Sequence, residues 1–397
     1  MSRSATLEYL ETVAVRYREA KDRIEKSRIL DEICATCGFH RKHAIRILAR
    51  RSKPRSPPRR KPGPKSIYAF PEILRPLKKI WLTANLPCSK RLKAMIPLWL
   101  PGYEALFAPL TTEARDKLLA ISASTIDRVL KHTRIMHTRH GRTTTKPGTL
   151  LRNQIPIATG QWQETRPGYL EADTVAHCGG SMAGEFAYTL DCVDIATGWT
   201  EQRAVWAKSD TSVVEQMRAI EKALPFPLLG FDSDNGSEFI NHALVRHFLS
   251  RQRPVQFTRS RAYKKDDNAH IEQKNWTHVR EWLGYERFDD PEVIRLMNEL
   301  YSNEWRFFHN FYSPSVKLVS KERVGSKTKK THDEAKTPYE RVMASEAVSD
   351  YTKNTLKMIR ENTNPFTLRK AIDQRIKKIF KLCYKHQVSA EPEEGRR

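Results

Sequence analysis

The chain has 397 residues, of which 39% are hydrophobic and 29% charged, and its formal net charge is +24. These proportions are typical of folded proteins and exclude a wholly disordered chain, and the length allows two to four domains. The excess of cations predicts a polyanionic partner, above all the phosphate backbone of a nucleic acid. The six scattered cysteines form no disulfide framework, which indicates a reducing, cytoplasmic compartment.

No membrane segment is expected. The first residues, "MSRSATLEYLETV", include acids and lack an apolar core, so they do not form a signal peptide. The most apolar run, at 94–110, contains three prolines and Glu104, which makes it a poor membrane span.

Two short helices around a glycine are predicted at 27–49. Apolar residues recur at helical spacing on both sides of Gly38, at Ile29, Leu30, Ile33, Ala44, Ile45 and Leu48. The pattern favours a helix-turn-helix DNA-binding domain in residues 1–52. Its second helix, beginning near His40, would present Arg41, Lys42 and Arg46 to DNA. The alternative is a plain helical hairpin with a solvated basic face.

A zinc site in the same stretch is not expected. Cys34, Cys37, His40 and His43 follow one another at intervals of three, and all are zinc-ligand types. Structural zinc sites usually separate two ligand pairs by a loop of about a dozen residues. Nothing separates the pairs here.

A basic linker follows at 53–66. Lys and Arg fill half of positions 50–65 and proline fills five more, so neither helix nor strand persists. Arg59, Arg60 and Lys61 are expected along a DNA backbone or in a minor groove, as in other basic arms. A solvated spacer is the alternative.

A second helical domain, again compatible with a helix-turn-helix, is predicted at 67–135. Its last helix has Ser122 or Ser124 as a cap and carries Arg128 and Lys131 as further DNA contacts. Residues 136–165 are rich in Thr, Arg, Gly and Pro without a sustained period, so they are expected to form a connector.

From residue 169 the pattern changes to strands. Strand-like runs occupy 169–178, 186–199, 200–208, 228–234 and 254–260, and helical runs occupy 210–224, 237–252 and 267–285. Three strands followed by alternating helix and strand is the order of the α/β ribonuclease H-like fold. We therefore expect such a core, with a mixed five-stranded sheet, at 166–315. A basic, mostly helical region is expected at 316–397.

Three acidic residues fall where such a core can bring them together. Asp173 lies in the first strand, Asp234 ends the fourth strand before Asn235–Gly236, and Glu272 lies on the closing helix. Phosphodiester chemistry with two metal ions requires converging carboxylates, because each hard cation takes several oxygen ligands. A strongly cationic protein has to supply that negative pocket itself.

Other acids nearby fit this pattern less well. Asp191 and Asp194 lie on the second strand and are expected to be structural, and Glu238 opens a helix whose dipole favours negative charge. Glu171 points to the same strand face as Asp173, but it sits one step earlier in the strand. Asp232 points to the same strand face as Asp234, but Asp234 directly precedes the Asn–Gly turn.

The segments "EADTV" (171–175), "SDNGSEF" (233–239) and "NAHIEQKN" (268–275) resemble, in order, three motifs of the integrase-core transposases. These are relatives of retroviral integrases, and the resemblance is greatest to transposases of bacterial insertion sequences. It covers roughly 165–315. It implies that Asp173, Asp234 and Glu272 form a DDE triad that holds two Mg²⁺ ions per active site, with Mn²⁺ as a substitute.

The resemblance also implies an activity and partners. The expected enzyme is a DNA transposase that binds the terminal inverted repeats of its element, cleaves to expose a 3′-OH and transfers that strand into target DNA. Double-stranded DNA is then the partner, the active form is a homodimer or higher oligomer, and the location is the nucleoid of a bacterial cytoplasm. Further expected DNA contacts are Lys264 and Lys265 in the active-site loop, and Asn268 and Asn275 on the face of Glu272.

Two other readings of the chain stay open. A domesticated or inactive transposase would keep the DNA-binding helices and act as a regulator. A ribonuclease H-like nuclease would instead cut RNA–DNA hybrids, although the large N-terminal duplex-binding regions argue against it.

Overall fold

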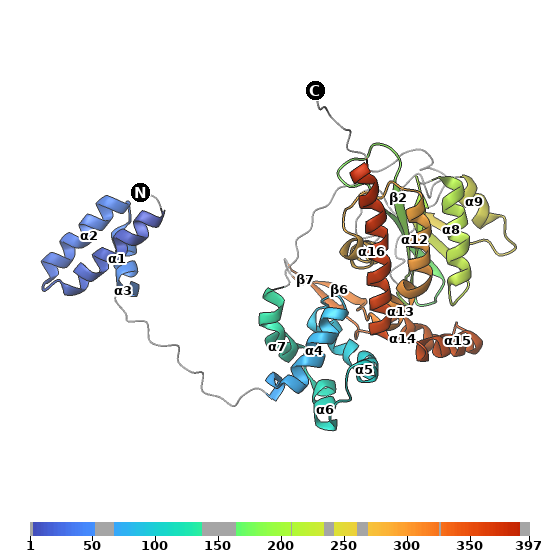
Figure 1. The fold of residues 1–397 in the computed structure, drawn as a ribbon, viewed down its shortest axis with the longest axis horizontal. Coiled ribbons are helices and arrows are strands. Elements are labelled where there is room, and N and C mark those ends of the chain that lie inside the picture. The colour runs from blue at the N-terminus through green and yellow to red at the C-terminus, as the bar shows by residue number, and fades with distance from the viewer. Residues whose placement is uncertain are drawn as a thin grey trace. The chain divides into compact units, whose positions relative to one another are not determined.

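The computed structural model describes residues 3–51, 67–136, 164–207, 209–233, 242–259, 269–324 and 327–389 (Figure 1). The chain divides into two compact units, residues 1–65 and 66–397. None of the described helices is both long and apolar enough to span a lipid bilayer.

The first unit is a three-helix bundle of α1 (Arg3–Glu19), α2 (Arg23–Cys37) and α3 (Arg41–Arg51). The Asp22 side chain caps α2 by accepting a hydrogen bond from the Glu25 backbone, and Gly38 ends the helix in the left-handed conformation, at φ 67°. The buried core consists of apolar side chains that include Leu10, Val13, Ile33, Ala44 and Leu48. The two helices expected around Gly38 are confirmed, and their binding to DNA stays a prediction.

The second unit begins with a helical bundle. Its elements are the 3₁₀ turn η1 (Ile67–Ala69) and the helices α4 (Pro71–Thr83), α5 (Ser89–Leu106), α6 (Thr112–Ala120) and α7 (Ala123–Ile135). Of the two serines considered as caps, Ser122 is the one that accepts a hydrogen bond from the Thr125 backbone.

A five-stranded mixed sheet follows. Its strands are β1 (Tyr169–Ala176), β2 (Ala187–Asp194), β3 (Thr200–Trp206), β4 (Gly230–Ser233) and β5 (Gln256–Arg259). The spatial order is β3-β2-β1-β4-β5, with β2 antiparallel to β1 and β3, and β4 parallel to β1 and β5. This order fits the predicted ribonuclease H-like core.

Helices cover both faces of this sheet. On one face, α8 (Asp210–Ala223) and α9 (His242–Leu249) pack on apolar strand residues such as Leu170 and Phe231 (Figure 1). The other face meets one continuous helix made of α10 (Ala269–Lys274), the π-helical turn η4 (Asn275–Arg280) and α11 (Glu281–Leu283). Beside it run α12 (Glu292–Leu300), the π-helical turn η5 (Tyr301–Trp305) and α13 (Arg306–Tyr312).

The C-terminal region contains a β-hairpin as well as helices. Its helices are α14 (Pro338–Ala344), α15 (Asp350–Glu361) and α16 (Pro365–Ser389), and α16 packs along α12. The antiparallel strands β6 (Leu318–Val324) and β7 (Lys327–His332) form a separate two-stranded sheet. The sequence did not predict these strands, because the Lys- and Thr-rich run lacks the alternation of apolar and polar residues that identifies a half-buried strand.

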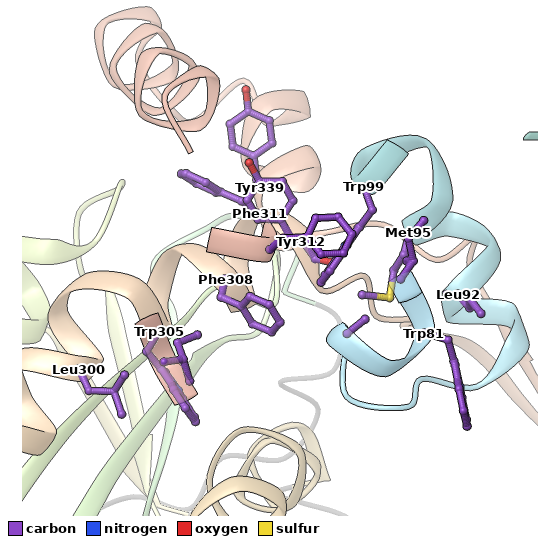
Figure 2. Close-up of a cluster of buried hydrophobic side chains, with 14 of the residues drawn as sticks. Trp81, Leu92, Met95, Trp99, Leu300, Trp305, Phe308, Phe311, Tyr312 and Tyr339 are labelled. Atoms are coloured by element: carbon purple, nitrogen blue, oxygen red, sulfur yellow. The ribbon is translucent and has the colours of Figure 1, made fainter. Parts of the chain in front are cut away.

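One aromatic core joins the α4–α7 bundle to the sheet domain. Figure 2 shows Trp99 of α5 facing Phe308 and Tyr312 of α13. The Trp99 ring packs edge-on against Phe308 and Phe366, with centroids 5.8 and 5.1 Å away, and its Nε1 donates to the Tyr312 carbonyl at 3.0 Å. Edge-on packing of this kind stabilises beyond area burial. The two regions therefore form one packed unit.

Truncating Trp99 is expected to destabilise the whole second unit. Trp99→Ala should lower the free energy of unfolding by about 3–5 kcal/mol, the usual cost of removing a large buried aromatic side chain. Trp276 is 43% exposed, so Trp276→Ala is the matched control and should cost far less. Thermal unfolding followed by circular dichroism measures both changes. A Trp99→Ala protein as stable as the control would contradict the shared core.

Three buried histidines should make this unit sensitive to acid. Burial lowers the pKa of His177 to about 3, and it lowers the pKa of His278 and His309 below the usual value as well. An unfolded histidine takes up a proton near pH 6.5, so between about pH 6.5 and 3 the unfolded chain binds more protons than the folded one. Stability therefore falls as the pH is lowered through this window.

The contribution of one such histidine to the pH dependence of the unfolding free energy can be measured. Removing His177 as His177→Gln should reduce the fall in unfolding free energy by up to about 1.4 kcal/mol per pH unit in urea titrations between about pH 6 and 4. His132 is exposed, so His132→Gln should leave the slope unchanged. Equal slopes in the two variants would show that His177 does not stay neutral in the fold.

Candidate active site

Strand β1 has one apolar and one acidic face. Successive side chains of a strand point to opposite faces. Leu170 and Ala172 enter the core under α8 and α9, so Glu171 and Asp173 belong to the face that α10 covers.

The neighbouring strands add carboxylates to the same face. Residues directly opposite one another in a sheet share a face, and the register pairs Asp173 with Asp191 of β2 and Glu171 with Asp232 of β4. Glu171, Asp191 and Asp232 are almost fully buried, and Asp173 is half-buried. Four carboxylates thus lie on one face of this cationic protein.

Several contacts offset the cost of this buried negative charge. Thr258 donates to Asp232 at 2.6 Å, and Gln202 donates to Asp191 at 2.7 Å. Burial raises the pKa of Asp191 to about 7, against the opposing effects of Gln202 and of the Lys274 ammonium. Burial likewise lowers the pKa of Lys274 to about 7. The Lys274 amine of α10 is thus buried within the electrostatic reach of Asp191 on this acidic surface.

Two hydrogen bonds hold the α10–η4 helix against β1. Glu171 Oε2 accepts from the Ile271 backbone N–H at 3.2 Å, and Asn275 Nδ2 donates to Asp173 Oδ2 at 2.6 Å. Two residues of strand span about 6.6 Å and four residues of helix about 6 Å, so the two bonds match in spacing. The helix consequently lies along β1 and runs in the same direction.

This attachment fixes the position of Glu272. Glu272 is exposed and lies between the two bonded residues of the helix. Residues three apart on a helix are neighbours, so Glu272 borders the side chain of Asn275 and, through it, the carboxylate of Asp173. A π-helical turn begins at Asn275, and such turns are frequent at functional sites. The Asn275–Asp173 bond thus joins the first acidic motif to the helix that carries Glu272.

The polar atoms around Asp173 suit a hard cation. Among the described residues, Asn275 Oδ1 and Asp191 Oδ2 are buried without a hydrogen-bond partner. Both are oxygens, the ligand type that Mg²⁺ and Mn²⁺ prefer. The described part of the chain does not by itself assemble three His, Cys, Asp or Glu side chains that could hold a metal ion. Asp234 lies outside that part.

Some of the other predicted residues lie within the described part of the chain and some lie outside it. Arg41 is paired with Asp31, whereas Lys42, Arg46, Arg128 and Lys131 are exposed on their helices. The predicted residues that lie outside the described part of the chain are Arg59, Arg60, Lys61, Asp234, Lys264, Lys265 and Asn268.

Sequence reasoning missed two residues of this site. Glu171 was set aside, although its strand parity with Asp173 already placed it on the acidic face. Lys274 carried no sequence signal, because a lysine on a helix is normally solvated. Asp194, by contrast, accepts from the backbone N–H groups of Gly168 and Thr197, which fixes the turn after β2 and agrees with the structural role expected for it.

The chain was compared with known proteins. It is 39% identical over 334 residues to "Uncharacterized protein y4rM" of Sinorhizobium fredii (strain NBRC 101917 / NGR234), an alignment that covers 84% of the chain and 93% of the relative. The chain belongs to the y4rM family. No family model matches it.

Membership of the y4rM family brings no assigned chemistry, because the relative is itself described as uncharacterized. Among solved structures, the catalytic core domain of BIV integrase aligns with 44% of the chain and 91% of its own length, at 14% identity and a TM-score of 0.25. A likeness of that size bears on neither the fold nor the chemistry. The function of this y4rM-family chain has to be argued from its residues.

The bond from Glu171 to the helix is open to a direct test. In Glu171→Ala the buried Ile271 N–H loses its acceptor, which should cost about 1–3 kcal/mol of unfolding free energy and loosen the helix that carries Glu272. Glu171→Gln retains an oxygen and should stay close to the wild type. Urea unfolding and amide hydrogen exchange at residues 269–275 report the two effects. Amide exchange at residues 269–275 as slow in Glu171→Ala as in the wild type would contradict this attachment.

Proposed function

We propose that this y4rM-family chain is a DNA transposase of the integrase-core type, which cleaves the ends of its element and joins them to target DNA. The observation that carries the proposal is the 2.6 Å hydrogen bond between Asn275 and Asp173, residues of two motifs that lie 102 positions apart. The contact supports the resemblance because it joins the first acidic motif to the helix that bears Glu272. The fit of the strand order to a ribonuclease H-like core agrees with it.

The proposed metal ligands are Asp173, Asp234 and Glu272. The parallel register of β1 and β4 extends to the pair of Ala172 with Ser233. The next residue in each segment is Asp173 and Asp234, respectively. One further step of that register would bring these two carboxylates side by side, and this supports Asp234 as the second ligand.

Each residue around the site has a role in the proposal. Two Mg²⁺ ions, when bound, supply an activated oxygen nucleophile and neutralise the charge that develops on the scissile phosphate. Asn275 orients the Asp173 carboxylate, and Glu171 fixes the helix so that Glu272 reaches the same place. Lys274 offsets the charge of Asp191 beneath them. The exposed position of Glu272 leaves room for a DNA strand beside it.

DNA binding is assigned to the helical regions. A net charge of +24 favours a phosphate backbone. In the first unit, α3 follows α2 across the Gly38 turn and carries exposed Lys42 and Arg46, and α7 of the second unit carries exposed Arg128 and Lys131. We propose that these helices recognise the inverted repeats of the element in the bacterial nucleoid. Two ends must be joined to one target, so the proposed active form is at least a dimer.

Strand cleavage tests the proposal. The substrate is a labelled duplex that contains the DNA flanking the coding region, incubated with the protein and Mg²⁺ or Mn²⁺. Wild-type protein should nick this duplex, and Glu272→Gln should lose activity by about 100-fold or more while still binding it. Glu215→Gln, an equal loss of charge at an exposed position on α8, is the matched control and should cleave normally.

Other outcomes of this assay would decide against the proposal. Tight binding by the wild-type chain without cleavage under any metal condition would favour the regulator. Cleavage of an RNA–DNA hybrid in preference to the duplex would favour the hybrid-specific nuclease. Full activity in Glu272→Gln would refute the assignment of the triad.

A further inference from the structure

The hairpin formed by β6 and β7, here called the basic ribbon (318–332), is rich in cations. Its sequence contains Lys321, Arg323, Lys327, Lys329 and Lys330 against a single acid, Glu322. The described side chains of Val319, Glu322, Lys329 and Lys330 are exposed. The ribbon is therefore a polar, positively charged two-stranded sheet that is separate from the main sheet.

The backbone register of the ribbon brings two lysine positions opposite each other. Lys321 is paired with Lys330, whereas Glu322 is paired with Lys329 and Val324 with Lys327. Like charges directly opposite one another destabilise an antiparallel pair. The pair of Glu322 and Lys329 brings opposite charges together. Such an arrangement is favourable when an external polyanion neutralises it.

The base of the ribbon is firmly attached to the rest of the unit. The guanidinium of Arg341 on α14 donates to the carbonyls of Ser315 and Lys336, both at 2.8 Å, and to the Asp333 carboxylate at 2.9 Å. Lys317 Nζ donates to the Ala196 carbonyl at 2.8 Å, in the turn between β2 and β3. The ribbon thus emerges from a rigid base tied to the sheet.

A cationic cleft lies at this base. It has a volume of about 560 Å³, and its lining includes Arg166, Lys317, Lys336 and Arg341 against two acids, Asp333 and Glu346. Lys317 and Asp333 directly flank the ribbon, so cleft and ribbon form one continuous surface. Two separate features, a lined cleft and a charged hairpin, therefore present positive charge at the same place.

We propose that the basic ribbon and the cleft at its base bind the backbone of duplex DNA, at a site separate from the cleavage centre. The major groove of B-DNA admits a two-stranded β-ribbon, and phosphates on either side of a groove lie within reach of lysines on both strands. The choice of duplex DNA as the occupant rests on the proposed function. The choice of the ribbon as the binding site rests on its charge and its two-stranded shape.

The cleft at the base of the ribbon lies before the start of β1 and away from Asp173. The cleft includes Pro167, which precedes β1, and Asp173 lies six residues further along. At about 3.3 Å per strand residue, this is about 20 Å. The ribbon would hold duplex DNA away from the scissile phosphate. Loss of the ribbon's charge should therefore weaken DNA binding without changing the rate at which bound DNA is cleaved.

The salt dependence of binding tests the ribbon. The probe is a short labelled duplex of arbitrary sequence, titrated between about 50 and 200 mM salt in the Glu272→Gln background, so that cleavage does not interfere. Combining Lys329→Gln with Lys330→Gln should weaken binding about 10-fold and reduce the slope of log K against log salt by about 2, because each lost phosphate contact removes about 0.9. The same pair in an otherwise wild-type chain should raise KM and leave kcat unchanged.

The matched control removes the same charge elsewhere. Lys353→Gln combined with Lys357→Gln changes two lysines of α15 and should leave the slope near its original value. An unchanged slope in the ribbon variant, or an equal reduction in the control, would overturn the proposal. Normal nicking by the wild-type chain with an unchanged slope in the ribbon variant would refute DNA binding by the ribbon alone. Absent nicking with the expected change in slope would refute the proposed function alone.

Discussion

The candidate site depends on how one helix is held against one strand. The Asp173–Asn275 and Glu171–Ile271 hydrogen bonds connect residues about a hundred positions apart, and they do so with matching spacing along strand and helix. Without them, Glu272 would sit on a helix whose position along β1 is set only by apolar packing. With them, the helix that carries Glu272 is fixed beside Asp173 on the acidic face.

That face is unusual for this molecule. Carboxylates are rarely buried unless they are paired, and here Glu171, Asp191 and Asp232 are buried together in a protein of strongly positive net charge. Hydrogen bonds from Thr258 and Gln202 and the ammonium of Lys274 meet part of the cost. We propose that a divalent cation adds positive charge at the same face. Structure and proposed chemistry therefore follow from the same electrostatic constraint.

Much of the core could be predicted from the sequence, because alternation in β1 and the helical period at 267–285 are strong local signals. Asp173 and Glu272 were selected by motif order, and their catalytic roles stay predictions. The roles of Glu171 and Lys274 could not be predicted in this way, since they depend on which strands are neighbours and on where a helix crosses them. The basic ribbon was missed for another reason, because a solvated two-stranded sheet needs no apolar pattern. The assignment of Asp234 stays a prediction.

The proposed metal site can be located from the anomalous scattering of Mn²⁺ bound in crystals of the protein. We expect a peak coordinated by the carboxylates of Asp173, Asp234 and Glu272, with Asn275 still bonded to Asp173. A peak elsewhere, or no peak at a Mn²⁺ concentration that supports cleavage, would contradict the proposed site.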